Sequence, residues 1–292
     1  MSQLVNGHEV TRDQVEVNDE PIRLYDIDNE LFPSTSTITG WYENPELDEI
    51  LENWKQKYDG SDGTAHHKDI KHLKACRGTI AHALTLDEFY DGELWSEEED
   101  VAVDRLKDFE SYRKRYIDTD EHPWNPAEIP FLDDETPHEW AMRTSEEIKQ
   151  MMLEEVLTGV DEVIAVEKYL YSPEWRFAGQ VDFIYRHENG DLVVCDLKTS
   201  KVVSEKYMLQ VAGYSKAYQE LFDKSVDRLQ IARACPESYG AKAESEIDMM
   251  WFVQDNDWDS RDDLEQAVKE LADEVNKLLD GANTSAIRSL MS

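Results

Sequence analysis

Two carboxylates and a lysine near the middle of the chain have the types and spacing of a site for a divalent cation. Asp196 and Lys198 are two residues apart in a segment rich in strand-forming residues, so their side chains leave the same face. Asp182 lies on the preceding segment, which a tight turn joins to this one, so it can reach the same place. Hard cations prefer carboxylate oxygens, and a nearby ammonium can act on the water beside such a cation.

The simpler interpretation of these residues is an ion pair between strands on the surface of an aspartate-rich protein. The residues before Asp196 argue against it, because Leu192-Val-Val-Cys195 has the composition of a buried strand. An ionised group in such a strand needs a partner or a metal. The sequence therefore favours the metal site.

Three further motifs accompany this pair. Gly78-Thr-Ile-Ala-His82 places a histidine one helical turn after a glycine, which permits close backbone approach. Glu167 lies mid-strand among apolar residues, where a carboxylate is costly unless it is paired or bound to a metal. Gln210 and Tyr214 share one helix face at i and i+4. Taken singly, the histidine reads as a structural group, and Gln210 with Tyr214 as an incidental amide beside a core tyrosine.

In this order the motifs resemble those of the RecB-type nucleases of the PD-(D/E)XK superfamily. They are G-x-x-x-H, a strand glutamate, G-x-x-D (Gly179 to Asp182), D-x-K (Asp196 to Lys198) and Q-x-x-x-Y, and they span about residues 77–218. The family includes the nuclease domains of bacterial recombination helicase–nucleases, CRISPR-associated exonucleases and many phage exonucleases.

The resemblance implies a set of metal ligands. His82, Asp182 and Asp196, together with the backbone carbonyl of Leu197, would hold Mg²⁺ or Mn²⁺. An imidazole ligand would favour Mn²⁺ somewhat, because it is softer than a carboxylate.

The resemblance also implies catalytic roles. Lys198 would orient or deprotonate the attacking water and help neutralise the charge that develops on the phosphate. Glu167 would act through coordinated water or a second metal ion. Gln210 and Tyr214 would hold the substrate phosphate or support Lys198.

Some members of the family carry an iron–sulfur cluster on one upstream cysteine and three near the C-terminus. This chain has Cys76, Cys195 and Cys235, with no C-x-x-C and no C-terminal triplet. We therefore expect no cluster, and buried reduced thiols in its place.

The most basic stretch of the chain, residues 66–77, runs directly into the G-x-x-x-H motif. Ordinary solvated helix charge is the alternative interpretation, but positive charge gathered beside a metal site is what a DNA track needs. Lys201 and Lys206 follow the D-x-K motif and add positive charge after it. The candidate DNA-binding residues are Lys68, Lys71, Lys74, Arg77, Lys201 and Lys206.

The overall charge argues against DNA binding at first sight, because 65 acidic residues against 30 basic ones give a formal net charge of −35. A polyanion usually does not bind nucleic acid. The carboxylates are spread along the chain with apolar patterning between them, unlike a disordered acidic tail. At about 1 M salt the Debye length falls to about 3 Å, so the repulsion between an acidic surface and DNA is almost fully screened. An acidic surface also keeps a protein soluble in such salt, and we therefore expect adaptation to high salt, in a halophile or a virus of one.

No basic region followed by an apolar stretch opens the chain, and no run approaches the ~18 apolar residues that span a bilayer. We therefore expect no membrane association and a cytoplasmic protein of a halophilic cell, or of a host cell if viral. The G-x-x-x-x-G-K-[ST] motif of nucleotide-driven motors is absent, so any unwinding would come from a helicase or recombination partner.

Periodicity and turn residues predict the elements that position these groups. Residues 1–32 should form a short strand or an ordered arm, and 33–39 a loop. We expect strands at 163–171, 177–185, 192–198, 227–234 and 246–253. We expect helices at 45–58, at 64–90 with an interruption near Gly78, at 97–117, 137–158 and 204–222, and at 260–279.

These elements predict an α/β fold with a mixed central sheet, flanking helices and, by resemblance, a restriction-endonuclease-like core. An N-terminal arm and helical region (1–90) and an acidic helical insertion (91–160) would join the nuclease core (161–292) in one structural domain. The expected function is metal-dependent DNA hydrolysis, by an exonuclease that prefers single strands, in recombination, repair or viral DNA processing. A structure-specific endonuclease on the same site and an inert DNA- or protein-binding module remain alternatives.

Overall fold

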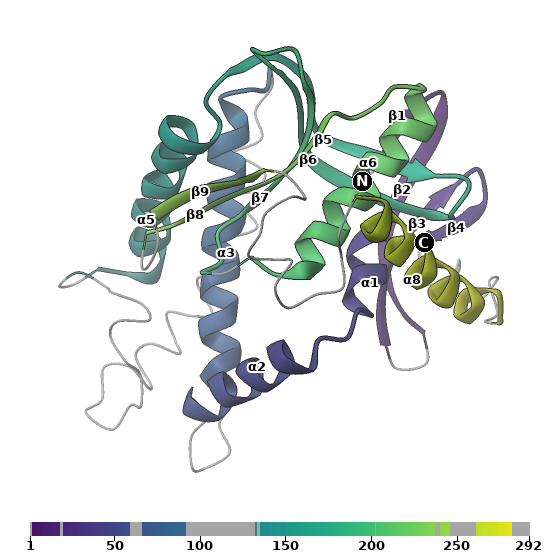
Figure 1. Ribbon diagram of the computed structural model, residues 1–292. Coiled ribbons are helices and arrows are strands. Elements are labelled where there is room, and N and C mark those ends of the chain that lie inside the picture. The colour runs from purple at the N-terminus through teal and green to yellow at the C-terminus, as the bar shows by residue number, and fades with distance from the viewer. Residues whose placement is uncertain are drawn as a thin grey trace.

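The fold was obtained as a computed structural model (Figure 1), which describes residues 2–17, 20–58, 66–91, 132, 135–201, 203–236, 240–245 and 261–281. These residues form an α/β fold with a five-stranded sheet, a four-stranded sheet and helices packed around them. None of the helices in these ranges is both long and apolar enough to span a membrane.

The five-stranded sheet carries the D-x-K motif. Its strands, in spatial order, are β5 (Val160–Ser172), β6 (Phe177–His187), β7 (Leu192–Lys198), β8 (Arg228–Cys235) and β9 (Gly240–Ser245).

Only β7 and β8 pair in parallel, because the chain crosses over between them through α6 (Glu205–Phe222). The predicted mixed sheet, with a hairpin and a crossover helix, is therefore confirmed. The strand predicted at 246–253 lies outside the described residues, and the sheet's last described strand is β9.

Helices cover both faces of this sheet (Figure 1). On one face α3 (His66–Asp87), α5 (Pro137–Met151) and the π-helical turn η2 (Met152–Val156) enclose a core that includes Cys195 and Leu197 of β7. On the other face α6 and α8 (Arg261–Gly281) pack against Val194. Because side chains alternate along a strand, Asp196 lies on the face toward α6.

The N-terminus forms a four-stranded antiparallel sheet, so the prediction of one short strand or an arm was wrong. Its strands are β1 (Ser2–Val5), β2 (His8–Val17), β3 (Glu20–Ile27) and β4 (Glu30–Pro33). Two-residue turns with positive φ, at Asn6-Gly7 and Asp28-Asn29, join β1 to β2 and β3 to β4. These are the residues that tight hairpin turns favour, so the signal was present in the sequence.

Two short segments after this sheet also differ from expectation. The predicted loop at 33–39 contains α1 (Thr35–Gly40), whose first turn is capped by Ser34 accepting a 2.9 Å hydrogen bond from the Thr37 N–H. Burial of Ile38 holds this helix in the core. The next helix, α2 (Pro45–Tyr58), confirms the prediction, although Ile50 on it stays 64% exposed.

The helical stretch predicted near 137–158 is confirmed as α5 followed by η2. Thr136 and Glu139 form a capping box at its start, as the reciprocal hydrogen bonds between them show. Trp140 and Ile148 are buried, so this part of the predicted insertion packs directly on α3 and the central sheet. The helix predicted at 97–117 lies outside the described residues.

Candidate active site

The hairpin of β6 and β7 brings Asp182 and Asp196 next to each other. The two strands pair up to Phe183 opposite Cys195, and the next residues along are the two aspartates. At this point the ladder ends, and the backbone N–H of Leu197 donates a 2.7 Å hydrogen bond to Asp182 Oδ2. The sequence therefore correctly predicted that these carboxylates share one place.

Asp196 is the most deeply buried group of the site, with no exposed surface. Its Oδ2 contacts the Lys198 ammonium, which also lies 4.8 Å from the centre of the Tyr207 ring. Among the described residues, Oδ1 of Asp196 accepts no hydrogen bond, whereas Oδ2 has the Lys198 ammonium beside it. Buried carboxylate oxygens without donors are costly, and a bound cation would satisfy them.

His82 on α3 completes the group, since its Nδ1 lies 3.7 Å from Asp182 Oδ2. Burial, with a contribution from the Lys198 charge, lowers the pKa of His82 to about 4. The imidazole is therefore neutral near pH 7, so this contact is not an ion pair, and the ring keeps a lone pair that a metal could use.

Gly78, one turn before His82, sits where α3 meets the residues after β7. A Cβ at Gly78 would lie 3.0 Å from Thr199 Oγ1, so glycine permits the close approach that the sequence predicted. The predicted interruption of the helix is not observed, because α3 runs unbroken through this position. Packing against the central sheet outweighs the roughly 1 kcal/mol by which glycine disfavours a helix.

Burial and the neighbouring opposite charges shift the pKa values of the site residues in opposite directions. Burial raises the pKa of Asp196 to about 6, with Lys198 opposing the rise and Asp182 adding to it. The pKa of Asp182 is also raised, mainly by burial. Burial tends to lower the pKa of Lys198, but the carboxylates of Asp196 and Asp182 outweigh it and the pKa is raised. Lys198 therefore holds its proton at neutral pH.

The donor set suits a hard divalent cation in an open site. In the part of the chain that the structure describes, no group of three or more His, Cys, Asp or Glu side chains is placed to hold a metal ion by itself. Mg²⁺ usually keeps several waters and is held by only one or two carboxylates. The adjacent carboxylates of Asp182 and Asp196, with Oδ1 of Asp196 free of donors among the described residues, fit such a cation.

Glu167 lies on β5, next to the strand that carries Asp182. The register of β5 and β6 places it opposite Asp182, between the pairs that flank it. Its backbone is left-handed, with φ 46°, and its carbonyl accepts a 3.0 Å hydrogen bond from Nε2 of Gln3. The left-handed residue interrupts the regular alternation of β5, which the sequence did not predict.

Gln210 and Tyr214 face each other on α6, as predicted, and Gln210 Nε2 donates a 2.7 Å hydrogen bond to the Tyr214 hydroxyl. Burial and the charges of Asp196 and Asp182 raise the pKa of Tyr214, which places its hydroxyl within electrostatic reach of the carboxylates.

Gly179 explains how the tyrosine comes so close to β6. A Cβ at Gly179 would lie 2.5 Å from a ring carbon of Tyr214 and 2.5 Å from Thr35 Oγ1. The glycine of G-x-x-D is therefore required by the packing of α6 and α1 on the strand that carries Asp182.

The basic residues predicted to bind DNA are placed in different ways. Lys68 and Lys71 on α3 are exposed and Lys74 is half-buried. Lys201 is half-buried after β7, and Lys206 on α6 donates a 3.3 Å hydrogen bond to the Gly40 carbonyl.

Arg77 differs from the lysines because it is buried, with 2% of its surface exposed. Its guanidinium lies 5.3 Å from the centre of the Trp140 ring and donates to the Thr199 carbonyl at 3.3 Å. Arg233, which the sequence reasoning missed, is buried and donates to the carbonyls of Ser200 and Lys201. These two arginines therefore hold the residues that follow Lys198.

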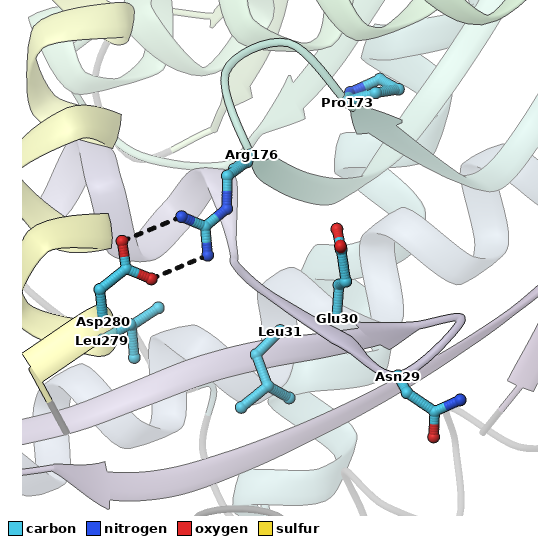
Figure 2. A pocket seen from close by; sticks show the side chains of 7 residues that line it. All are labelled: Asn29, Glu30, Leu31, Pro173, Arg176, Leu279 and Asp280. Atoms are coloured by element: carbon cyan, nitrogen blue, oxygen red, sulfur yellow. Dashed lines mark hydrogen bonds and ion pairs between the residues drawn. The ribbon is translucent and has the colours of Figure 1, made fainter. Parts of the chain in front are cut away.

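A pocket of about 300 Å³ lies elsewhere, between the β3–β4 turn, the β5–β6 turn and the end of α8 (Figure 2). Arg176 on one side donates two 3.1 Å hydrogen bonds to Asp280 on the other. None of the carboxylates or the lysine described above lines it. The chemistry of the site lies at the splayed end of the β6–β7 hairpin.

A mixed sheet that presents two carboxylates and a lysine at the end of a hairpin is the arrangement of a metal-dependent nuclease. The chain belongs to the PD-(D/E)XK nuclease superfamily, whose family pattern matches residues 58–288. No curated protein matches it. Nucleases of this superfamily generally use a divalent metal such as Mg²⁺ or Mn²⁺, so membership points to a metal-dependent nuclease with DNA as its substrate.

Proposed function

We propose that this protein is a RecB-type exonuclease that hydrolyses DNA with a preference for single strands. The observation that carries the proposal is the buried Asp196 carboxylate, which lies beside Asp182, is paired with the Lys198 ammonium through Oδ2, and has no donor for Oδ1 among the described residues. The motifs from G-x-x-x-H to Q-x-x-x-Y, in the order of RecB-type nucleases, support the subfamily.

In this proposal the metal is held by His82, Asp182, Asp196 and the carbonyl of Leu197. Bound there, Mg²⁺ or Mn²⁺ supplies a Lewis acid for the phosphate and lowers the pKa of water. The neutral imidazole of His82 favours Mn²⁺ over Mg²⁺ to some degree.

Lys198 acts in its protonated form. Its raised pKa leaves the ammonium charged at neutral pH, so it orients the attacking water and neutralises charge that develops on the phosphate oxygens. Taking a proton from water would first require loss of its own.

The remaining motif residues act on the substrate and on water. The hydrogen-bonded pair of Gln210 and Tyr214 orients the phosphate or supports Lys198. Glu167, opposite Asp182 in the strand register, acts through water or a second metal ion. The exposed lysines of α3, together with Lys201 and Lys206, guide the strand toward the site, whereas buried Arg77 holds the backbone after Lys198.

The setting of the reaction is proposed from charge and from motifs. A net charge of −35 spread along the chain suits molar salt, where repulsion between this surface and DNA is screened. No nucleotide-driven motor motif occurs in the sequence, so a helicase or recombination protein would supply unwound DNA. Recombination, repair and viral DNA processing are the pathways that use such an enzyme.

The test is incubation of the purified chain with linear and circular single strands and Mn²⁺, in high salt. Degradation of the linear strand alone supports the exonuclease. Loss of both strands would establish a structure-specific endonuclease in its place. Loss of neither, with DNA still bound, would identify a binding module and overturn the proposal.

A further inference from the structure

Two arginines lie on one face of the N-terminal sheet, outside the segment that matches the nuclease superfamily. Arg12 of β2 pairs with Tyr25 of β3, so their side chains share a face. Arg23 lies two residues before Tyr25 on β3 and therefore points to the same side. We call these two residues, with Tyr25 and Tyr169, the arginine patch.

Arg12 joins this sheet to the strand that carries Asp182. Its Nη1 donates a 2.5 Å hydrogen bond to Oε1 of Gln180, and its guanidinium lies 5.8 Å from the centre of the Tyr169 ring. Gln180 pairs with Tyr169 across β5 and β6. The same amide contacts the Glu167 carbonyl through Nε2 at 3.5 Å.

The patch lies close to the carboxylates. Gln180 and Asp182 are two residues apart on β6, so their backbones lie about 7 Å apart along the strand. Tyr25 also contributes to the raised pKa of Tyr214, after burial and the charges of Asp196 and Asp182. The Tyr25 hydroxyl is therefore within electrostatic reach of the residue that faces the site from α6.

The two arginines lack the partners that this acidic chain offers in abundance. Among the described residues, neither Arg12 nor Arg23 forms an ion pair with a carboxylate. Other arginines do contact one, namely Arg143, Arg176, Arg186, Arg228 and Arg261. Two neighbouring arginines without a carboxylate among the described residues can bind another anion.

The patch also contains a buried hydroxyl, on Tyr169. The Tyr169 side chain is fully buried, and its hydroxyl makes no hydrogen bond to any residue that the structure describes. An unpaired hydroxyl of this kind costs free energy unless a ligand or water satisfies it. The guanidinium of Arg12 has N–H donors beyond the one bonded to Gln180, and such donors match the oxygens of a phosphate group.

We propose that the arginine patch binds a backbone phosphate of the nucleic-acid strand near the one that is cleaved, which rests on the proposed nuclease function. Arg12, fixed by Gln180, takes the phosphate with its fork, and exposed Arg23 adds charge beside it. The N-terminal sheet thereby sets the path of the strand across β6, a role that the superfamily match at 58–288 does not cover. Both are positioning residues, because they act on a phosphate other than the reacting one.

The experiment compares Arg12→Ala, Arg23→Ala and the double variant with wild type in the full chain. Binding of a labelled single-stranded oligonucleotide is measured in EDTA by fluorescence anisotropy, over the salt range in which circular dichroism shows each protein folded. We expect Kd to rise about tenfold for Arg12→Ala, because the substitution removes a charge-assisted hydrogen bond. The slope of log K against log salt should fall by about 0.7 for each phosphate that is no longer neutralised.

The matched control is Arg176→Ala, which removes an arginine bonded to Asp280 at the pocket of Figure 2 and should change neither quantity. Arg12→Lys should keep the salt slope and reduce the affinity in part, because charge remains and the fork is gone. Exposed Arg23 makes no side-chain hydrogen bond among the described residues, so its variant tests the patch without disturbing the fold.

The outcomes separate this inference from the proposed function. If wild type cleaves and the patch variants bind with unchanged Kd and slope, the patch is structural and the inference is overturned, while the nuclease stands. If wild type binds without cleaving and the variants lose affinity and slope, the patch is supported and the nuclease is wrong. If wild type neither binds nor cleaves DNA, both are overturned.

Discussion

The backbone N–H of Leu197 donates a 2.7 Å hydrogen bond to Oδ2 of Asp182, where the β6–β7 ladder ends. A side chain thus takes the place of the main-chain carbonyl that the ladder would otherwise supply. The bond fixes one oxygen of Asp182 beside Asp196 before any cation is bound, so the two carboxylates are preorganised by the hairpin itself.

Asp182→Asn separates this structural bond from metal binding. The amide oxygen can still accept the Leu197 N–H, so the folded structure should persist, with a melting temperature close to that of wild type. Loss of the negative charge should weaken Mn²⁺ binding by more than about tenfold and abolish cleavage. Isothermal titration with Mn²⁺ and a nuclease assay measure both, and tight Mn²⁺ binding by the variant would exclude Asp182 as a ligand.

Lys198→Ala tests whether the ammonium acts on the reaction. Its removal should lower the cleavage rate by about 100-fold or more, because a preorganised charge near the phosphate is lost. Oligonucleotide affinity and Mn²⁺ affinity should stay within a few-fold of wild type. Lys224→Ala, at an exposed lysine after α6, is the control. Cleavage by Lys198→Ala at the wild-type rate would contradict a catalytic role of the Lys198 ammonium.

Asp196→Asn tests the cost of burying a carboxylate. Burial raises the pKa of Asp196 in the folded protein from 3.8 to about 6. Because the folded state has the higher pKa, it binds the proton more tightly than the unfolded state. The contribution of Asp196 to stability is therefore fully present below pH about 4 and is lost as the pH rises through about 6.

Asparagine cannot ionise, so the stability of Asp196→Asn relative to wild type should increase between pH 4 and 8, by up to about 3 kcal/mol. Thermal melts in EDTA across this range measure the difference. The ion pair with Lys198 needs no separate allowance, because it forms only when Asp196 is ionised and the pKa of about 6 already includes the effect of the lysine. Asp273→Asn, at an exposed position of α8, is the control, and a difference that does not change with pH would contradict the prediction.

Charge reversal of the exposed and half-buried lysines of α3 tests whether these residues bind DNA. Replacing Lys68, Lys71 and Lys74 by Glu should weaken binding of single-stranded DNA severalfold, because three positive charges on the helix that carries His82 become negative. Mn²⁺ affinity measured without DNA should barely change. A matched reversal at Lys224, Lys269 and Lys277, on and before α8, should matter much less. Equal loss of binding in both triple variants would show that the α3 lysines are ordinary surface charge.

The net charge of −35 predicts a dependence on salt. At about 50 mM salt the carboxylates repel one another over a Debye length longer than 10 Å, whereas at about 1 M that length is about 3 Å. Dialysis to low salt should therefore reduce the circular-dichroism signal of the helices and abolish cleavage, and both should return with KCl. A folded, fully active protein at low salt would rule out adaptation to molar salt.

Structural features that depend on residues close together in the chain could be predicted from the sequence. The alternation and turn residues around Asp182 and Asp196 predicted the hairpin, because a strand's two-residue repeat decides which side chains share a face. Helical spacing predicted the contact between Gln210 and Tyr214 for the same reason. The Asn6-Gly7 turn carried a signal of this local kind that our interpretation of the N-terminus overlooked.

What only the tertiary structure decided are the contacts between distant segments. The burial of Arg77 beneath Trp140, and the bond from Arg12 to Gln180, 168 residues further along the chain, follow from how sheets and helices pack. The left-handed backbone of Glu167 is likewise held in place by Gln3 from another sheet. Such contacts depend on packing between elements whose relative placement no local repeat encodes, so the sequence by itself determined the chemistry of the hairpin, and the fold determined which side chains surround it.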